Sequence, residues 1–117
     1  MAFKFEQLRV WQLSIDLTDK IHVLTKTFPK EELYILTQQI KRAADSVALN
    51  IAEGSTGQTN DEFKRFLGYA IRSGIEVVTC LYIAKRRNYL ANEMFLELYD
   101  FIDSLIKMIK ALRNSLN

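Results

Sequence analysis

Polar side chains with the potential for chemistry gather near the end of one predicted helix, in the stretch "AADSVALNIAEGS". Ser46, Asn50 and Glu53 are spaced by four and three residues, which places them on one helical face as a polar column. The apolar stripe of this helix, continued in steps of three and four residues, reaches Asn50, so we expect the Asn50 amide to face the core. A buried polar residue of this kind fixes the register of packed helices at a cost in stability.

Catalysis by this column would need a second functional group. Glu53 has no facing histidine, second acid or metal ligand, so general acid–base chemistry lacks a partner. His22 is the one histidine and Cys80 the one cysteine, and the Glu-x-x-His pairs of di-iron bundles are missing from the sequence. The sequence therefore predicts a structural column, no enzymatic activity, and no cofactor or metal. We expect Glu53 to meet the first N–H groups of the next helix, Arg65 or a neighbouring subunit.

Basic side chains form the second candidate site. Six of them are candidates for contact with nucleic acid: Lys41, Arg42, Lys64, Arg65, Arg72 and Arg86. The last three are separated by multiples of seven residues, so they follow one side of a helix. Because the net charge is only +2 and the pI about 8.7, attraction to phosphates depends on where these cations lie. The alternative is a solvated face, interrupted by Glu76 and balanced by acids such as Asp45 and Asp61.

Four helices must position these groups, because apolar residues recur at spacings of three and four and strand-like alternation is missing. We expect the helices at Glu6–Lys26, from Pro29 to Gly54, from Asn60 to Arg87, and from Asn92 to Leu116. Short connections between long helices favour antiparallel neighbours, which predicts an all-α, up-down-up-down four-helix bundle. A chain of 117 residues has room for a single domain, residues 1–117.

Several residues carry signals for helix ends. Pro29 suits the first position of the second helix, and Gly54 is a natural left-handed stop. Thr59 and Glu62 form the pattern of a capping box at the start of the third helix. Asn92 is expected to cap the fourth helix.

Apolar residues outside the predicted core stripes need a second explanation. They are Trp11, Ile15, Met94, Tyr99, Phe101 and Met108. A homo-oligomer would cover them, which makes these residues candidates for a subunit interface. The alternative is a broad core face or scattered apolar surface residues, which are ordinary in monomers.

The cellular setting is predicted from what the sequence lacks. No segment approaches the roughly 20 uninterrupted apolar residues that cross a bilayer, and "MAFKFEQLRV" has no signal-peptide core. The lone Cys80 cannot form an intramolecular disulfide, and its helical neighbours Val77 and Leu81 predict a small buried residue. We therefore expect a cytoplasmic protein without a membrane partner.

Three segments in this order resemble a known family: "FEQLRVWQ", "FPKEELYILTQQIKRAADSVALNIAEGS" and "EFKRFLGYAIRSGIEV". The chain is similar to the four helix bundle protein family, also called the ribosomal-RNA intervening-sequence protein family, from about Phe5 to Ala84. The most specific pieces are Phe28-Pro29, the Gln39–Ala44 stretch, Asn50–Gly54, and Phe66-Leu67 with Ser73 and Glu76.

The resemblance implies a small bundle that assembles as a homopentamer, in a family whose cellular role is largely unassigned. Some of its genes lie in insertions within large-subunit ribosomal RNA genes. The accessory variability determinant of diversity-generating retroelements looks like a relative, which implies RNA or DNA and a reverse transcriptase as partners. Many members carry arginine just after the Glu-Gly stop, where this chain has Gly57 and Gln58, so this loop departs from a phosphate site.

Two functions remain as predictions. The first is a pentameric, non-enzymatic protein that binds RNA or DNA through backbone-directed basic surfaces, since no base-reading motif is present. The second is a protein-interaction scaffold for a separately encoded partner, without nucleic-acid binding.

Overall fold

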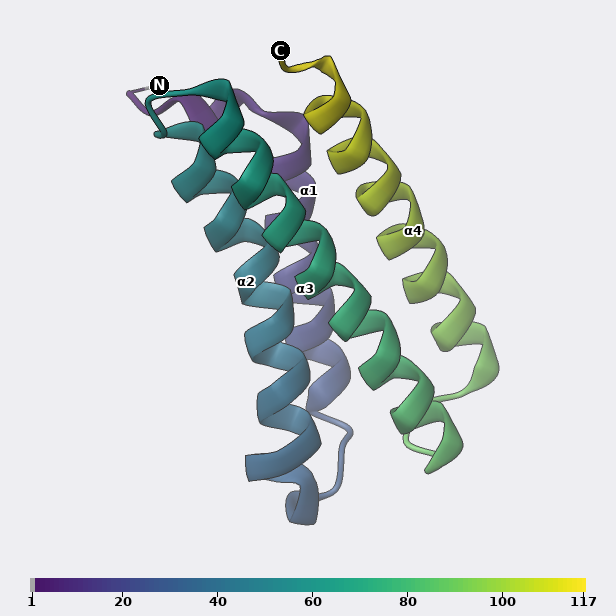
Figure 1. Ribbon diagram of the computed structural model, residues 1–117. Coiled ribbons are helices and arrows are strands. Elements are labelled where there is room, and N and C mark those ends of the chain that lie inside the picture. The colour runs from purple at the N-terminus through teal and green to yellow at the C-terminus, as the bar shows by residue number, and fades with distance from the viewer. Residues whose placement is uncertain (1) are drawn as a thin grey trace.

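The computed structural model describes residues 2–117, and in that range it contains four long α-helices and no strand (Figure 1). They are α1 (Arg9–Thr25), α2 (Gln38–Ser55), α3 (Asn60–Arg86) and α4 (Asn92–Ser115). Each helix packs against the next, and α4 also packs against α1. The N- and C-terminal ends lie at the same end of the bundle, as the up-down-up-down order requires (Figure 1). The prediction of an all-α four-helix bundle is confirmed.

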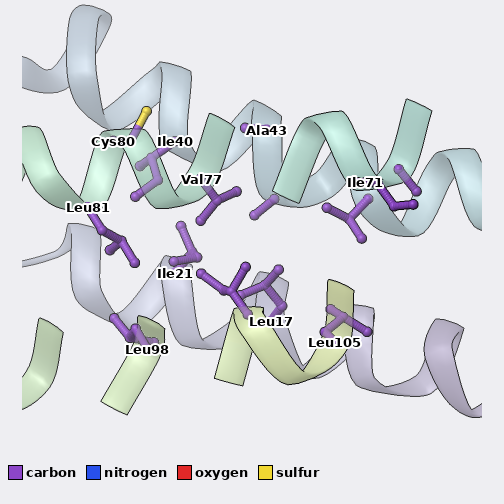
Figure 2. Close-up of a cluster of buried hydrophobic side chains, with 14 of the residues drawn as sticks. Leu17, Ile21, Ile40, Ala43, Ile71, Val77, Cys80, Leu81, Leu98 and Leu105 are labelled. Atoms are coloured by element: carbon purple, nitrogen blue, oxygen red, sulfur yellow. The ribbon is translucent and has the colours of Figure 1, made fainter. Parts of the chain in front are cut away.

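Buried side chains from all four helices fill the interior and point toward one another (Figure 2). Fully buried examples are Leu17 and Ile21 of α1, Ile40 of α2, Leu81 of α3 and Leu105 of α4. Each such side chain contributes about 2 kcal/mol by leaving water, so together they fix the rotation of every helix. By length and composition α3 is apolar enough to cross a bilayer, but its apolar stripe packs into this core, as in an ordinary core helix.

The second helical segment begins through two irregular turns. Pro29 precedes the 3₁₀ turn η2 (Lys30–Glu32), and the π-helical turn η3 (Leu33–Thr37) follows before α2. Pro29 is therefore the N-cap and not the first helical residue that we predicted, because its backbone, with ψ 152°, is extended. Single π-helical turns are frequent at functional sites.

Gly54 does not stop α2 in a left-handed conformation, and this prediction is wrong. No glycine in residues 2–117 has a positive φ, and α2 continues to Ser55. A Cβ atom on Gly54 would lie 2.6 Å from the Cβ atom of Phe66 and 3.1 Å from Cδ1 of Phe63. Gly54 is thus required for the close approach of α2 to α3.

Both ends of α3 are capped by local hydrogen bonds. Thr59 Oγ1 accepts the Glu62 N–H at 3.1 Å, which confirms Thr59 as the N-cap. The reciprocal bond of the predicted capping box, from the Thr59 N–H to the Glu62 carboxylate, does not form within residues 2–117. At the other end Asn88 adopts φ 63°, and the Tyr89 N–H donates to the Ala84 carbonyl at 2.9 Å. This Schellman arrangement turns the chain toward α4 and fixes where Tyr89 points.

The start of α4 differs from the prediction, whereas its core seam agrees with it. Asn92 is already helical, and Ala91 occupies the capping position without a side-chain hydrogen bond. The predicted seam is buried along most of its length, at Phe95, Leu98, Ile102, Leu105 and Ile109. The helix therefore depends on packing rather than on a cap.

Candidate nucleic-acid interface

The arginine stripe, defined as Arg65, Arg72 and Arg86, runs along the exposed side of α3. All three residues are exposed, and within residues 2–117 no carboxylate lies within 4 Å of any of them. The opposite side of α3 is buried in the core, so core packing holds the stripe outward. At 1.5 Å per residue, Arg65 and Arg72 lie about 10 Å apart along the helix axis. Guanidinium groups without a carboxylate partner are able to contact phosphates along a nucleic-acid strand.

The two basic candidates on α2, Lys41 and Arg42, lie on different flanks of the bundle. Lys41 lines a small groove between α1 and α2 with His22 and Asp45. Arg42, the next residue, lines a different groove between α2 and α3 with Glu76. Because a step of one residue turns a helix by about 100°, Lys41 and Arg42 cannot share one surface.

Cations near the end of α3 have separate roles. The Lys85 ammonium lies 4.5 Å from the centroid of the Phe95 ring, a cation–π contact that holds it toward α4. Arg87 bonds Glu32 instead. Lys64, near the other end of α3, is half-buried. Of the six basic residues predicted to contact nucleic acid, the arginine stripe and Arg42 on α2 are therefore the ones that face solvent on the same side of the bundle.

The predicted polar column is present on α2 but points away from the core. Asn50 is half-buried, and its side-chain amide donates to the Ser46 carbonyl at 2.8 Å. The buried stripe continues through Ile51 and Gly54, which are one position beyond the register we expected. Glu53 is exposed, and the described residues offer its carboxylate no hydrogen bond or ion pair. At the N-terminus of α3, where we expected Glu53 to bind, Thr59 is the capping residue instead.

The six apolar residues predicted for a subunit interface lie on three flanks of the bundle. Trp11 and Ile15 share a stripe with Thr18 and His22, which line the groove toward α2. Met94, Phe101 and Met108 repeat every seven residues on one side of α4. That side faces α1, because the Lys20 ammonium lies 5.0 Å from the Phe101 ring centroid.

Tyr99 lies on the opposite side of α4, toward α3. Its ring centroid is 6.4 Å from that of Tyr82 in an edge-to-face arrangement. The same region exposes Ile75 and Leu96. The bundle thus has an apolar patch between α3 and α4, defined as Ile75, Tyr82, Leu96 and Tyr99.

An open apolar groove of about 610 Å³ lies between α1 and α4. Its apolar lining includes Val23, Leu90, Met94 and Leu98, and acids and a lysine stand at its edge: Asp19, Lys20 and Glu97. Val23 is 63% exposed and Met94 43% exposed. We call this feature the α1–α4 groove. It is large enough to receive side chains from another polypeptide.

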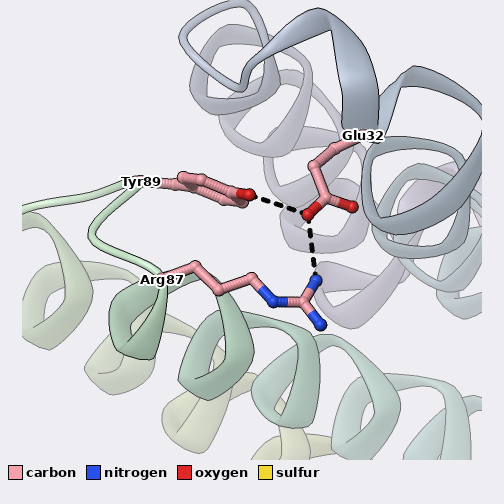
Figure 3. Close-up of polar contacts among 3 residues, drawn as sticks. All are labelled: Glu32, Arg87 and Tyr89. Atoms are coloured by element: carbon pink, nitrogen blue, oxygen red, sulfur yellow. Dashed lines mark hydrogen bonds and ion pairs between the residues drawn. The ribbon is translucent and has the colours of Figure 1, made fainter.

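A polar cluster that the sequence analysis did not predict lies at the end of the bundle opposite to the two termini (Figure 3). It joins the connection between α1 and α2 to the connection between α3 and α4. Glu32 Oε2 accepts the Tyr89 hydroxyl at 2.8 Å and the Arg87 guanidinium at 3.0 Å. The hydrogen bond from Tyr89, and with it the positive charge of Arg87, lowers the pKa of the Glu32 carboxyl. Donation to the carboxylate raises the pKa of the Tyr89 hydroxyl. The cluster holds the α1–α2 and α3–α4 connections together.

Replacing Glu32 by glutamine should lower the urea midpoint of unfolding near neutral pH. Because folding lowers this pKa below its ordinary value of 4.5, the stabilisation is present above that value and is lost as the pH falls through the folded pKa. The difference between Glu32→Gln and the parent protein should therefore shrink toward about pH 3. Glu31→Gln, which changes a neighbouring exposed acid, is the control and should leave the midpoint unchanged; a midpoint difference independent of pH would contradict this account.

Cys80 is buried in the core, and burial, together with the nearby Glu76 charge, raises its pKa to about 11. At pH 8 only about one thiol in a thousand is then ionised. We expect a thiol reagent such as dithionitrobenzoate to leave the native protein unlabelled and to label it at once in urea. Labelling of the native protein at the rate of an exposed thiol would show that the core opens readily.

Within residues 2–117, no group of three His, Cys, Asp or Glu residues is placed to hold a metal ion.

Comparison with known proteins identifies a family and a related structure. The family model described as 23S rRNA-intervening sequence protein matches residues 6–111. Among solved structures, the chain is similar to a protein with unknown function from the S23 ribosomal protein family of Bacteroides thetaiotaomicron VPI-5482. The two share 21% sequence identity with a TM-score of 0.82, over 89% of this chain and 97% of that one. None of the curated proteins matches the chain.

Proposed function

The chain belongs to the 23S rRNA-intervening sequence protein family, and from that premise we propose that it is a non-enzymatic, homopentameric helical bundle that binds the backbone of RNA or DNA. The observation that carries this proposal is the arginine stripe. Its three guanidinium groups are exposed and free of carboxylate partners within residues 2–117. A guanidinium kept free of carboxylate partners is available for phosphate.

Self-association is supported by the apolar surface on two neighbouring sides of the bundle. The α1–α4 groove of one copy is concave, and the apolar patch between α3 and α4 exposes Ile75, Tyr82 and Leu96. A contact between the patch of one copy and the groove of the next is heterologous, so it generates a ring if the rotation between copies closes. Both sides meet at α4, and in a bundle of 22 × 22 Å cross-section adjacent sides are roughly perpendicular. Sides at such an angle close a ring of about four to five copies, since four copies need about 90° and five about 108°; the number five follows the family resemblance.

Assembly would amplify a weak electrostatic attraction. One chain carries a net charge of +2, so five copies carry about +10 and repeat the arginine stripe five times. Several weak phosphate contacts made at once bind far more tightly than each contact alone. Binding is expected to be backbone-directed and sensitive to salt.

The proposal is tested with fluorescent single-stranded RNA and DNA of the same mixed sequence, by anisotropy at about 50 and about 200 mM salt. We expect binding at low salt that weakens by at least about tenfold at the higher salt, because counterions are released from the phosphates. Absence of binding at low salt for both RNA and DNA would overturn nucleic-acid binding.

A protein-interaction scaffold is the second candidate, and the α1–α4 groove favours it. The groove holds about 610 Å³, and the acids Asp19 and Glu97 at its edge suit a helix with an apolar stripe and basic flanks. In this case the partner, rather than a second copy, fills the groove. A monomer that ignores nucleic acid but binds a separately encoded protein such as a reverse transcriptase would favour the scaffold.

A further inference from the structure

A second, polar groove lies between α2 and α3 and has a different lining from the α1–α4 groove. It holds about 380 Å³ and is lined by Tyr34, Gln38, Gln39, Arg42, Ser46 and Glu76, together with Ile35 and Ala43. Its walls therefore combine an aromatic ring, a cation, a carboxylate and two amides. The volume is sufficient for one nucleobase with its sugar.

The irregular start of the second helical segment shapes one end of this groove. Tyr34 and Ile35 belong to the π-helical turn η3, and Tyr34 is 82% exposed. A tyrosine this exposed contributes little to the core, so packing does not account for its position. An exposed aromatic ring beside a groove is a surface on which a base can stack.

Opposite this turn, Glu76 presents its carboxylate from α3. Glu76 Oε2 accepts a long hydrogen bond from the Gln39 side-chain amide at 3.5 Å, and the described residues provide no ion pair to it, although Arg42 lines the same groove. One carboxylate oxygen is therefore free, and the other is only weakly engaged. A carboxylate with this freedom accepts two parallel N–H donors well.

We infer that this groove binds one unpaired guanine of a nucleic acid, with Glu76 accepting the base edge, Tyr34 stacking on its face and Arg42 contacting the adjoining phosphate. Guanine offers two adjacent donors, N1–H and N2–H, on its Watson–Crick edge. Adenine and cytosine each place a ring acceptor beside a single amino group, and uracil has one donor between two carbonyls. Each of those edges would place an acceptor lone pair beside the Glu76 carboxylate, and the two would repel each other.

The inference rests on the proposed nucleic-acid binding and adds a base preference to it. The arginine stripe adjoins the groove, because Arg72 and Glu76 are four residues apart on α3 and so are neighbours on its surface. A strand whose phosphates follow the stripe can thus place one base in the groove. In this arrangement Arg42, which is not part of the arginine stripe, contacts the phosphate next to the bound base.

The first experiment compares binding of four 12-nucleotide uridine strands, one unmodified and three carrying a single central guanosine, adenosine or cytidine. We expect the guanosine strand to bind about tenfold more tightly than the other three. Glu76→Gln should abolish this preference while leaving affinity for the oligouridine strand within about twofold. Equal affinity for all four strands would overturn the inference and leave backbone binding intact.

Matched variants separate the groove from general charge and folding effects. Glu53→Gln removes the same charge from an exposed position on α2 outside the groove, so it should keep the guanosine preference. Tyr34→Phe should keep it and Tyr34→Ala should weaken it, because stacking needs the ring and not the hydroxyl. A loss of preference in Glu53→Gln equal to that in Glu76→Gln would assign the effect to net charge and overturn the inference.

A second measurement distinguishes failure of the groove from failure of the proposed function. Titration of the protein with guanosine 5′-monophosphate, followed by NMR, should shift the resonances of Tyr34, Arg42 and Glu76, whereas adenosine 5′-monophosphate should shift them at least about tenfold less at equal concentration. Selective shifts without any oligonucleotide binding would keep the groove and reject the proposed function. Equal shifts with both nucleotides, or none, would overturn the groove.

Discussion

Replacing Gly54 by alanine is expected to destabilise the bundle by about 2 kcal/mol, the usual size of an overpacking effect, whereas replacing Gly68 by alanine should stabilise it by about 0.5–1 kcal/mol. A Cβ at Gly54 meets the Phe66 Cβ at 2.6 Å. That atom is attached directly to the α3 backbone, so it cannot swing aside and the two helices must separate. A Cβ at Gly68 meets nothing closer than Arg113 Nη1 at 3.9 Å.

Urea unfolding followed by circular dichroism measures both changes. The two variants make the same chemical change in helices of the same bundle, so their opposite signs isolate the contact between α2 and α3. Equal midpoints for Gly54→Ala and Gly68→Ala would show that Gly54 is not needed for close helix approach.

Reversing the charge at Arg65 and Arg72 together is expected to weaken binding of RNA or DNA by about a hundredfold at low salt, because two phosphate contacts per chain are replaced by repulsion. The double change takes the net charge of the chain from +2 to −2. Both residues are exposed, so the fold is expected to survive. Anisotropy with the mixed-sequence strand measures the loss.

Arg9→Glu with Lys30→Glu is the matched control, because it produces the same net charge at exposed positions. Both residues begin helical turns, where an acid is favoured by the helix dipole. This control should lose affinity by only a few-fold through net charge. If the control loses as much as the Arg65→Glu/Arg72→Glu variant, the arginine stripe is not the binding surface.

The helical repeat was sufficient to predict the bundle and the outward side of α3. Phe63, Leu67 and Leu81 recur at helical spacing and are all buried, so the arginine stripe on the other side had to face solvent. Predictions from single residues were less successful. Gly54 and Asn92 have strong local preferences for helix ends, but packing of α2 against α3 and of α4 in the core extended both helices through them.

Contacts between distant parts of the chain left no signal in the sequence pattern. Glu32 bonds Arg87 and Tyr89 across separations of 55 and 57 residues, and helical spacing says nothing about such pairs. The same limit applies to the predicted interface. A spacing of seven grouped Met94 with Phe101 on one flank of α4, but it gives the direction of a side chain only around its own helix. Which neighbouring helix lies on that flank depends on how the bundle closes.

The central claim is that each chain exposes more apolar surface than its own four helices cover, so that copies join and align their arginines. Light scattering during size-exclusion chromatography at high protein concentration tests this most directly. The account predicts an assembly of five 13.6 kDa chains, about 68 kDa in all. A single species of 13.6 kDa under those conditions would contradict it, and the proposed ring of arginines with it.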